Sequence, residues 1–251
     1  MWWYVTALGL AAIILGMAKS GFGGGIGILA VPLTANVLPA DQAIGVLLPM
    51  LIVGDVFASY AHRKHVDWPV ARPMLLGAVL GIGIGTGVLL LLTDNATLTF
   101  ALNLTVGGIC LLMVAVQAWR LAGFNLPRVP ANKTSGVSIG SVAGVASTLA
   151  HSAGPIGAIY LLEIKLPKRA FVATTAWFFF LVNLLKLPTY LALALITPST
   201  LVQSAWGMLF IPVGTVLGLW AHSRIPEKPF TILIYATAAL AAARMIWTAF
   251  A

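Results

Sequence analysis

The sequence predicts an all-α integral membrane protein made of two inverted repeats of five segments each. Three observations lead to this prediction: the composition, the placement of the basic residues, and a weak self-match of the chain at a constant offset. Of the 251 residues, 60% are hydrophobic and only 8% are charged, whereas a soluble domain carries about a quarter charged residues. So few charges cannot form a polar shell, so the expected solvent is the lipid bilayer and no soluble domain is expected.

Ten apolar segments follow one another along the chain. Most are long enough for the ~20 residues that a membrane-spanning helix needs, but the second and the seventh are too short. The first begins near the N-terminus, where the basic region typical of a signal peptide is missing. The eighth contains Pro188, which predicts a kink or a tilt there. The predicted segments are residues 2–18, 23–38, 42–61, 70–92, 96–119, 135–150, 153–164, 169–196, 200–221 and 229–249.

The basic residues predict the orientation of the chain. Even-numbered connections between segments hold no lysine or arginine, and most of the 14 basic residues fall in the odd-numbered ones. Cytoplasmic loops are enriched in these residues, so both termini are predicted on the outer side. The same bias accounts for the net charge of +8, and no nucleic-acid partner is expected. The basic residues of the odd-numbered connections are Arg63, Lys64, Arg72, Arg120, Arg128, Lys133, Lys165, Lys168, Arg169, Arg224 and Lys228.

The self-match has an offset of 130 residues and runs without a gap from about residue 19 to residue 100. For example, Ile26-Gly27 falls on Ile156-Gly157, and Ser59-Tyr60 falls on Thr189-Tyr190. Each copy has an odd number of segments, so the second enters the membrane upside down, as in many secondary transporters. The expected organisation is a first transmembrane repeat (1–119), a cytoplasmic linker (120–134) and a second transmembrane repeat (135–251).

Each repeat begins with a short broken or re-entrant helix pair. The break in residues 17–32 reads MAKSGFGGGIGILAVP, and its counterpart in residues 149–160 reads LAHSAGPIGAIY. A helix that starts after such a break directs free N–H groups and the positive end of its dipole at one point, which suits a small anion. Ordinary hairpin turns, with Lys19 reaching the cytoplasmic interface, remain the alternative. The sequence does not decide whether the pairs cross fully or return to the side they came from.

Two ionisable residues lie deep inside apolar segments. Asp55 lies in the third segment and Lys186 in the eighth, at nearly equivalent places under the offset. Such residues are costly in a membrane, so they are functional candidates, as coupling groups or as an ion pair that fixes helix packing. Asn183 precedes Lys186 by one turn and shares its face. The predicted substrate-binding residues are Lys19, Ser20, Gly23, Gly24, Gly25, His151, Ser152, Gly154, Asn183 and Lys186.

Other motifs point away from an enzyme. The glycines of GIGIGTG at 81–87 lie inside a spanning segment, where they suit close helix packing rather than a phosphate loop. Cys110 is the single cysteine, and no cluster has the spacing of metal ligands or of a nucleophile and its base. Neither a metal nor another cofactor is expected.

The glycine-rich SGFGGGIGILAVPL, the following PADQAIGVLLP and the second-half GSVAGVASTLAHSAGPIGAIYLLEIKLPKRAFVATTAWFFFLVNLLK together resemble the sulfite exporter TauE/SafE family of bacterial membrane transporters. The resemblance covers nearly the whole chain. In the second half, the usual run of glycines is reduced to Ala153-Gly154-Pro155.

This resemblance implies a secondary transporter that exports sulfite or an organosulfonate such as sulfoacetate across the inner membrane, by proton-coupled alternating access. A passive anion channel, or an importer of thiosulfate or a related small anion, is the alternative. The expected partners are the small anionic substrate and the lipid bilayer, and a homodimer is left open.

Overall fold

Helices make up all the regular structure in the described part of the chain, as the apolar composition predicts. A computed structural model describes residues 2–19, 27, 29–91, 95–123, 130–224 and 227–250. The elements are α1 (Trp2–Lys19), α2 (Ala30–Ala35), α3 (Ala40–His62), the short 3₁₀ helix η2 (Arg63–His65), α4 (Trp68–Leu91), α5 (Asn95–Leu121), α6 (Lys133–Ala150), α7 (Ala153–Glu163), α8 (Lys168–Ala192), α9 (Pro198–Met208), α10 (Ile211–Arg224) and α11 (Glu227–Phe250).

Five stretches within the described residues are long and apolar enough to cross a membrane. They lie in α3, α4, α5, α8 and the combined α9–α10 segment. Helix α1 is also apolar, but its candidate stretch, Thr6–Lys19, is shorter. The prediction of a multi-pass membrane protein is therefore confirmed at this level.

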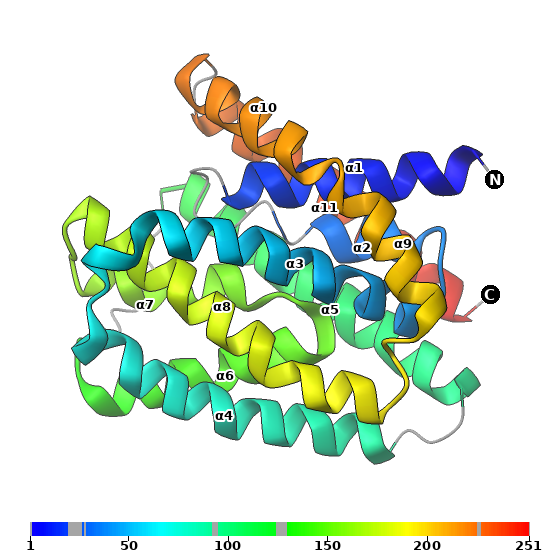
Figure 1. The fold of residues 1–251 in the computed structure, drawn as a ribbon, viewed down its shortest axis with the longest axis horizontal. Coiled ribbons are helices and arrows are strands. Elements are labelled where there is room, and N and C mark those ends of the chain that lie inside the picture. Colours follow the sequence, from blue (N-terminus) through cyan, green and yellow to red (C-terminus); the bar gives the residue numbers. More distant parts are fainter. Residues whose placement is uncertain are drawn as a thin grey trace.

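The long helices run roughly along the long axis of the molecule (Figure 1). Helix α4 packs on α6, α3 on α8, α5 on α11, and α1 on α10. The N- and C-termini lie at one end of the long axis, and the turn between α3 and α4 lies at the other. That turn contains Arg63 and Lys64, so these two basic residues are far from both termini.

The predicted ninth segment is two helices rather than one. Helix α9 ends at Met208, and α10 begins at Ile211 after a tight turn in which the Phe210 N–H donates to Gly207 O at 2.9 Å. Pro212 explains the break, because its ring would clash with the carbonyl of Met208 in a continuous helix and it has no N–H to donate. Pro212 is tolerated in the first turn of α10, where no partner is needed.

Two other predicted segments differ from the structure. The eighth was expected to reach residue 196, but α8 continues through Pro188 and ends at Ala192. The chain then turns through Ala194, whose φ of 51° is left-handed, and Thr197 caps α9. Of the second segment, 23–38, the structure describes the six-residue helix α2, and residues 20–26 and 28 lie outside the described part.

Glycines bring α4 and α6 into backbone contact. A Cβ added to Gly77 would lie 2.0 Å from Val137 O, and one added to Gly81 would lie 2.0 Å from Ser141 O. On the facing helix, a Cβ on Gly140 would lie 2.1 Å from Met74 O. Small residues spaced by four allow this approach in membrane helices. Within GIGIGTG, the packing interpretation therefore holds for Gly81 and Gly85, whose added Cβ atoms would meet α6, and not for Gly83 and Gly87, which meet nothing within 4 Å.

Polar side chains also tie neighbouring helices together in the interior. Ser204 on α9 donates to Val46 O on α3 at 2.7 Å, and Trp177 on α8 donates through Nε1 to Ser59 O at 3.1 Å. The hydroxyls of Thr86 on α4 and Thr189 on α8 are 3.0 Å apart. Where water is absent, such bonds satisfy polar atoms and fix the helix positions.

The close contact of α4 and α6 predicts a position-specific sensitivity to added volume. Gly77→Val should lower the apparent Tm of the detergent-solubilised protein by roughly 2–10 °C, because overpacking costs about 1–3 kcal/mol. Gly83→Val is the matched control, since a Cβ at Gly83 meets nothing within 4 Å. Equal melting temperatures for the two variants would contradict the described packing of α4 on α6.

Candidate functional site

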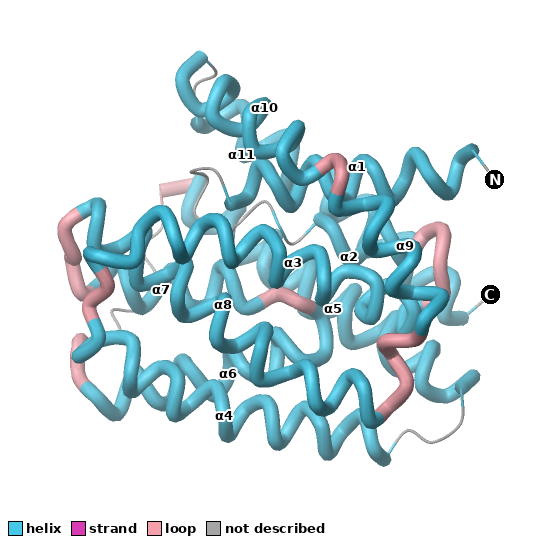
Figure 2. Tube along the Cα trace, viewed as in Figure 1, coloured by secondary structure: helices cyan, strands magenta, loops and turns pink. Residues whose placement is uncertain are grey.

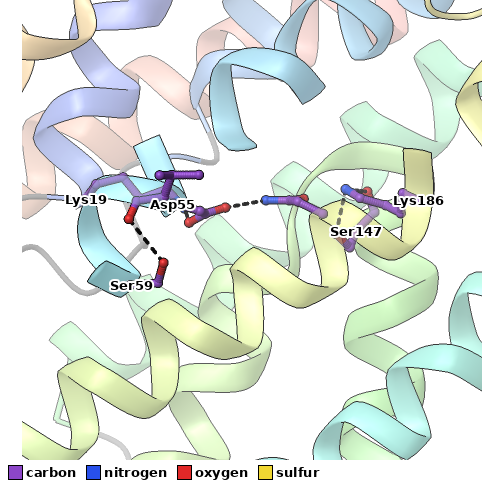
Figure 3. Close-up of polar contacts among 7 residues, drawn as sticks. Lys19, Asp55, Ser59, Ser147 and Lys186 are labelled. Carbon is purple, nitrogen blue, oxygen red and sulfur yellow. Dashed lines mark hydrogen bonds and ion pairs between the residues drawn. The ribbon is translucent and has the colours of Figure 1, made fainter. Parts of the chain in front are cut away.

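A buried carboxylate joins three helices. Asp55 on α3 has no exposed surface. Lys19, at the end of α1, forms an ion pair with Asp55 Oδ1, and Asn183 on α8 donates through Nδ2 to Asp55 Oδ2 at 2.6 Å (Figure 3). An isolated carboxylate would be very costly to bury, and here each oxygen has a donor. The ion pair and this hydrogen bond therefore hold α1, α3 and α8 together.

A second buried cation lies one turn along α8. Lys186 is fully buried, and its Nζ lies 2.9 Å from Ser147 Oγ and 3.1 Å from Ser147 O on α6 (Figure 3). The same Nζ lies 2.9 Å from His151 Nδ1. On the far side of the imidazole ring, His151 Nε2 lies 2.9 Å from Ile44 O on α3. The side chain of His151 therefore links Lys186 to α3.

These contacts define the proton positions. An ammonium group has three N–H donors, and Ser147 O, Ser147 Oγ and His151 Nδ1 accept all three. Ile44 O can only accept, so His151 Nε2 carries the ring proton. These acceptors can take all three N–H groups of a protonated Lys186, and His151 is then the neutral tautomer with its proton on Nε2. In that arrangement neither side chain has an N–H left for a ligand.

His151 also ends α6. Its backbone has a φ of 50°, in the left-handed region that non-glycine residues rarely adopt. Both ring nitrogens are bonded, and the ring lies against Tyr190, whose hydroxyl donates to Thr148 O at 2.7 Å. The chain turns through Ser152 and starts α7 at Ala153, and Figure 2 shows this loop in the interior, about midway along the long axis. The break therefore faces protein rather than lipid, as unpaired backbone requires.

A small cavity lies where these helices meet. Side chains of α1, α2, α3, α6, α7 and α8 line it, and its volume is about 50 Å³. Its polar lining comes from Lys19, Ser147, His151 and Asn183. A water needs about 10–15 Å³ of such space, so the cavity has room for roughly three to five waters or one compact ion.

N–H donors collect around this cavity. Ala153 and Gly154 line it and form the first turn of α7, where backbone N–H groups have no partner within the helix. Among the described residues, the hydrogen-bonding partner of Lys19 is Asp55, and Lys19 Nζ lies 5.6 Å from the ring centre of Phe179. In contrast, the described residues contain no group of three or more histidines, cysteines and carboxylates that could hold a metal. The arrangement is therefore suited to an anion.

The structure brings together four of the predicted substrate-binding residues. Lys19, His151, Gly154 and Asn183 all line the cavity. Ser152 does not, because its hydroxyl donates to Ala150 O at 3.0 Å. Ser20, Gly23, Gly24 and Gly25 lie outside the described residues.

The two predicted intramembrane charges are not paired with each other. Asp55 pairs with Lys19, while Lys186 lies behind His151 and is absent from the cavity lining. Of the roles considered for these two residues, a direct ion pair between them is therefore not what the structure shows, and a coupling role stays a prediction. Sequence equivalence placed the two residues at matching depths, but each side chain turns to a different helix.

Ser147 was missed by the sequence interpretation. It lines the cavity and accepts twice from Lys186. Its position, four residues before His151 on α6, places both side chains on one helix face. A search for polar residues one turn before the break would have found it.

Comparison with known proteins identifies the family. The family described as "Sulfite exporter TauE/SafE" matches residues 8–245. A "Probable membrane transporter protein" of Xylella fastidiosa (strain 9a5c) is 35% identical over 115 residues, which cover 43% of this chain and 42% of that protein. One of the same description from strain Temecula1 / ATCC 700964 is 34% identical over 115 residues, with the same coverage. The matched part therefore spans under half the length of these relatives, and no solved structure matches significantly.

The ion pair of Lys19 and Asp55 predicts energetic coupling. Lys19→Met and Asp55→Asn should each lower the apparent Tm, because each leaves a buried polar group without its partner. The double variant should lose less than the sum of the two, by a coupling of about 0.5–3 kcal/mol. Asp41→Asn is the control, since among the described residues the half-buried Asp41 has a single, long contact of 3.4 Å with Thr99 Oγ1 and should change little. Additive effects of the two substitutions would contradict the pairing.

Proposed function

Because the chain belongs to the sulfite exporter TauE/SafE family, we propose that it is a secondary transporter that exports a small sulfur-containing anion across the cell inner membrane. The substrate is sulfite or an organosulfonate such as sulfoacetate. The observation that carries the proposal is the cavity at the start of α7, which is lined by Lys19 and by Ala153 and Gly154 of the first helical turn. The names of the matched relatives, both probable membrane transporters, agree with it.

The charges around the cavity favour an anion. Lys19 and Asp55 compensate each other, and a protonated Lys186 adds one positive charge that no described carboxylate pairs with directly. The N-terminal end of the α7 dipole adds roughly half an elementary charge. Inside a low-dielectric interior such charges act over several ångströms, so Lys186 attracts the anion without touching it.

The cavity volume helps to choose among substrates. Sulfite has four heavy atoms, and a space of about 50 Å³ suits an ion of that size. Sulfoacetate is twice as large and needs a wider site. In this conformation we therefore favour sulfite as the substrate.

We also propose that the helices form two inverted repeats. The helix starts support this, because the first residues of four helix pairs lie 128–132 residues apart in the sequence. The pairs are α1 and α6, α3 and α8, α4 and α9, and α5 and α11. The packing supports it too. Helix α1 contacts α9 and α10, and its proposed counterpart α6 contacts α4, the counterpart of α9. Helix α3 packs on its counterpart α8, and α5 packs on its counterpart α11. Reciprocal contacts of this kind are expected around a two-fold axis. Under this proposal both termini lie outside, and the basic turn with Arg63 and Lys64 faces the cytoplasm.

Alternating access would then move the two repeats around the cavity, which lies between α1 to α3 of one and α6 to α8 of the other. The buried ionisable groups Asp55 and Lys186 are the candidates to carry a coupling proton. Each has partners on another helix, so a change in its charge alters contacts between helices.

Anion binding tests the proposal directly. In a thermal-shift series with sulfite, sulfate, thiosulfate and sulfoacetate, sulfite should raise the apparent Tm most. Lys19→Gln should weaken binding roughly tenfold or more, since it removes a charge-assisted donor. The exposed Lys64 provides the control, and Lys64→Gln should bind like the wild type. Unchanged affinity in Lys19→Gln would exclude the cavity as the site.

Transport mode needs a separate measurement. In proteoliposomes, sulfite flux should respond to an imposed pH gradient at a fixed sulfite gradient. A passive channel would instead give a reversal potential that follows the sulfite gradient alone and does not move with pH. Lys186→Met, which keeps length but removes charge, should abolish flux while the protein still reaches the membrane, and near-normal flux would exclude an essential role for Lys186.

A further inference from the structure

A second, larger cavity lies at the end of the molecule where both termini are found. Residues of α1, α2 and α11, with two residues of the turn after α2, line it, and its volume is about 370 Å³. Thr6, Ala7 and Leu10 are in the first half of α1, and Leu240, Ala241 and Arg244 are in the second half of α11. This places the cavity within a few turns of the beginning of α1 and the end of α11 (Figure 1).

The size and lining do not suit the small anion of the first cavity. The volume falls in the range of about 300–1,000 Å³ that is usual for organic ligands. Most of the wall is apolar, with Leu10, Leu33, Val37 and Leu240 among its residues. A compact, fully hydrated oxyanion gains little from such a wall, whereas a hydrocarbon chain is stabilised by it.

The cavity is open toward the surface that faces lipid. Leu10 is 55% exposed and Leu240 is 74% exposed, although both contribute to the wall. Large apolar side chains exposed in this way are expected where a membrane protein meets acyl chains. A ligand can therefore enter sideways from the bilayer.

Arg244 is the one charged residue among those that line this cavity. It is exposed, and the ion pair that the described residues form joins Lys19 to Asp55, so Arg244 has no carboxylate partner there. Trp247, one turn further along α11, is 76% exposed. Tryptophan and arginine near a helix end are typical of the headgroup level of a bilayer, and a guanidinium binds phosphate through two parallel hydrogen bonds.

We propose that this cavity is a binding site for a phospholipid, which it recognises by the phosphate of the headgroup and by an acyl chain. The lipid phosphate binds Arg244, and one acyl chain lies along Leu10, Leu33 and Leu240. Charge complementarity at Arg244 and the apolar wall beneath it together require an amphiphile. The site does not depend on which anion the protein transports.

The position of the lipid links it to the first cavity. Helix α1 lines the lipid site with Ala7 and Leu10 and the anion cavity with Leu15 and Lys19. Helix α2 also lines both cavities, the anion cavity with Ala30 and Val31 and the lipid site with Leu33. A bound lipid therefore braces the two helices that flank the anion, on the side away from it.

Lipid binding to the purified full-length chain tests the site. Native mass spectrometry in detergent would follow titration with phosphatidylglycerol and with diacylglycerol of the same acyl chains, which lacks the phosphate. The wild type should prefer phosphatidylglycerol, and Arg244→Gln should weaken it roughly tenfold or more and lose the preference. Arg169→Gln is the matched control, because Arg169 is exposed on α8 at the end away from the termini and should keep wild-type binding.

Two further arms distinguish the alternatives. Ala241→Phe fills the apolar part of the cavity and should displace both lipids while Arg244 stays in place, provided that the apparent Tm of the apoprotein matches that of the wild type. Inorganic phosphate and sulfite should not compete with phosphatidylglycerol. Competition by either free ion, or wild-type lipid binding in Arg244→Gln, would overturn the proposal; competition would point to a soluble oxyanion subsite instead.

Discussion

The arrangement of the site depends on the contacts of the buried carboxylate of Asp55 with Lys19 and Asn183. Asp55 has no exposed surface, and in a low-dielectric interior its charge must be compensated from within the protein. Lys19 and Asn183 provide that compensation from two other helices. As a result, the end of α1 is held at the middle of α3, and its ammonium group faces the cavity. The cation of the cavity is therefore placed by a structural ion pair.

The second lysine, Lys186, is compensated in the interior by neutral acceptors instead of by a carboxylate. Lys186 has no carboxylate in contact, and three neutral acceptors on α6 and its C-terminal turn take its protons. Because one acceptor is the ring of His151, the same contacts stabilise the left-handed residue at which α6 ends. The start of α7 follows directly after that turn, and the first two residues of α7, Ala153 and Gly154, line the cavity. Lys186, the turn at His151 and the start of α7 are thus connected through direct contacts or adjacent residues.

In each of the two proposed repeats, a lysine joins the first helix to the third. In the first, Lys19 extends from α1 to Asp55 on α3, and in the second, Lys186 extends from α8 to Ser147 on α6. The lysine is on the first helix, α1, in one case and on the third helix, α8, in the other, while the same two positions in the repeat are joined. An asymmetric site between similar halves can bind an anion whose two ends differ, as the sulfur and oxygens of sulfite do.

The sequence alone predicted a membrane protein, the approximate ends of most helices and the break between α6 and α7, because hydropathy, proline and glycine act locally along the chain. Those signals also marked Lys19, His151, Gly154 and Asn183 as residues of one site. Only the tertiary structure decided which charges pair. Asp55 and Lys186 occupy nearly equivalent positions in sequence, yet the direction of each side chain depends on which helix packs beside it, at distances along the chain that no local pattern records. For the same reason only the structure shows that Lys186 lies behind His151 and that Ser147, a polar residue one turn before the break, holds it there.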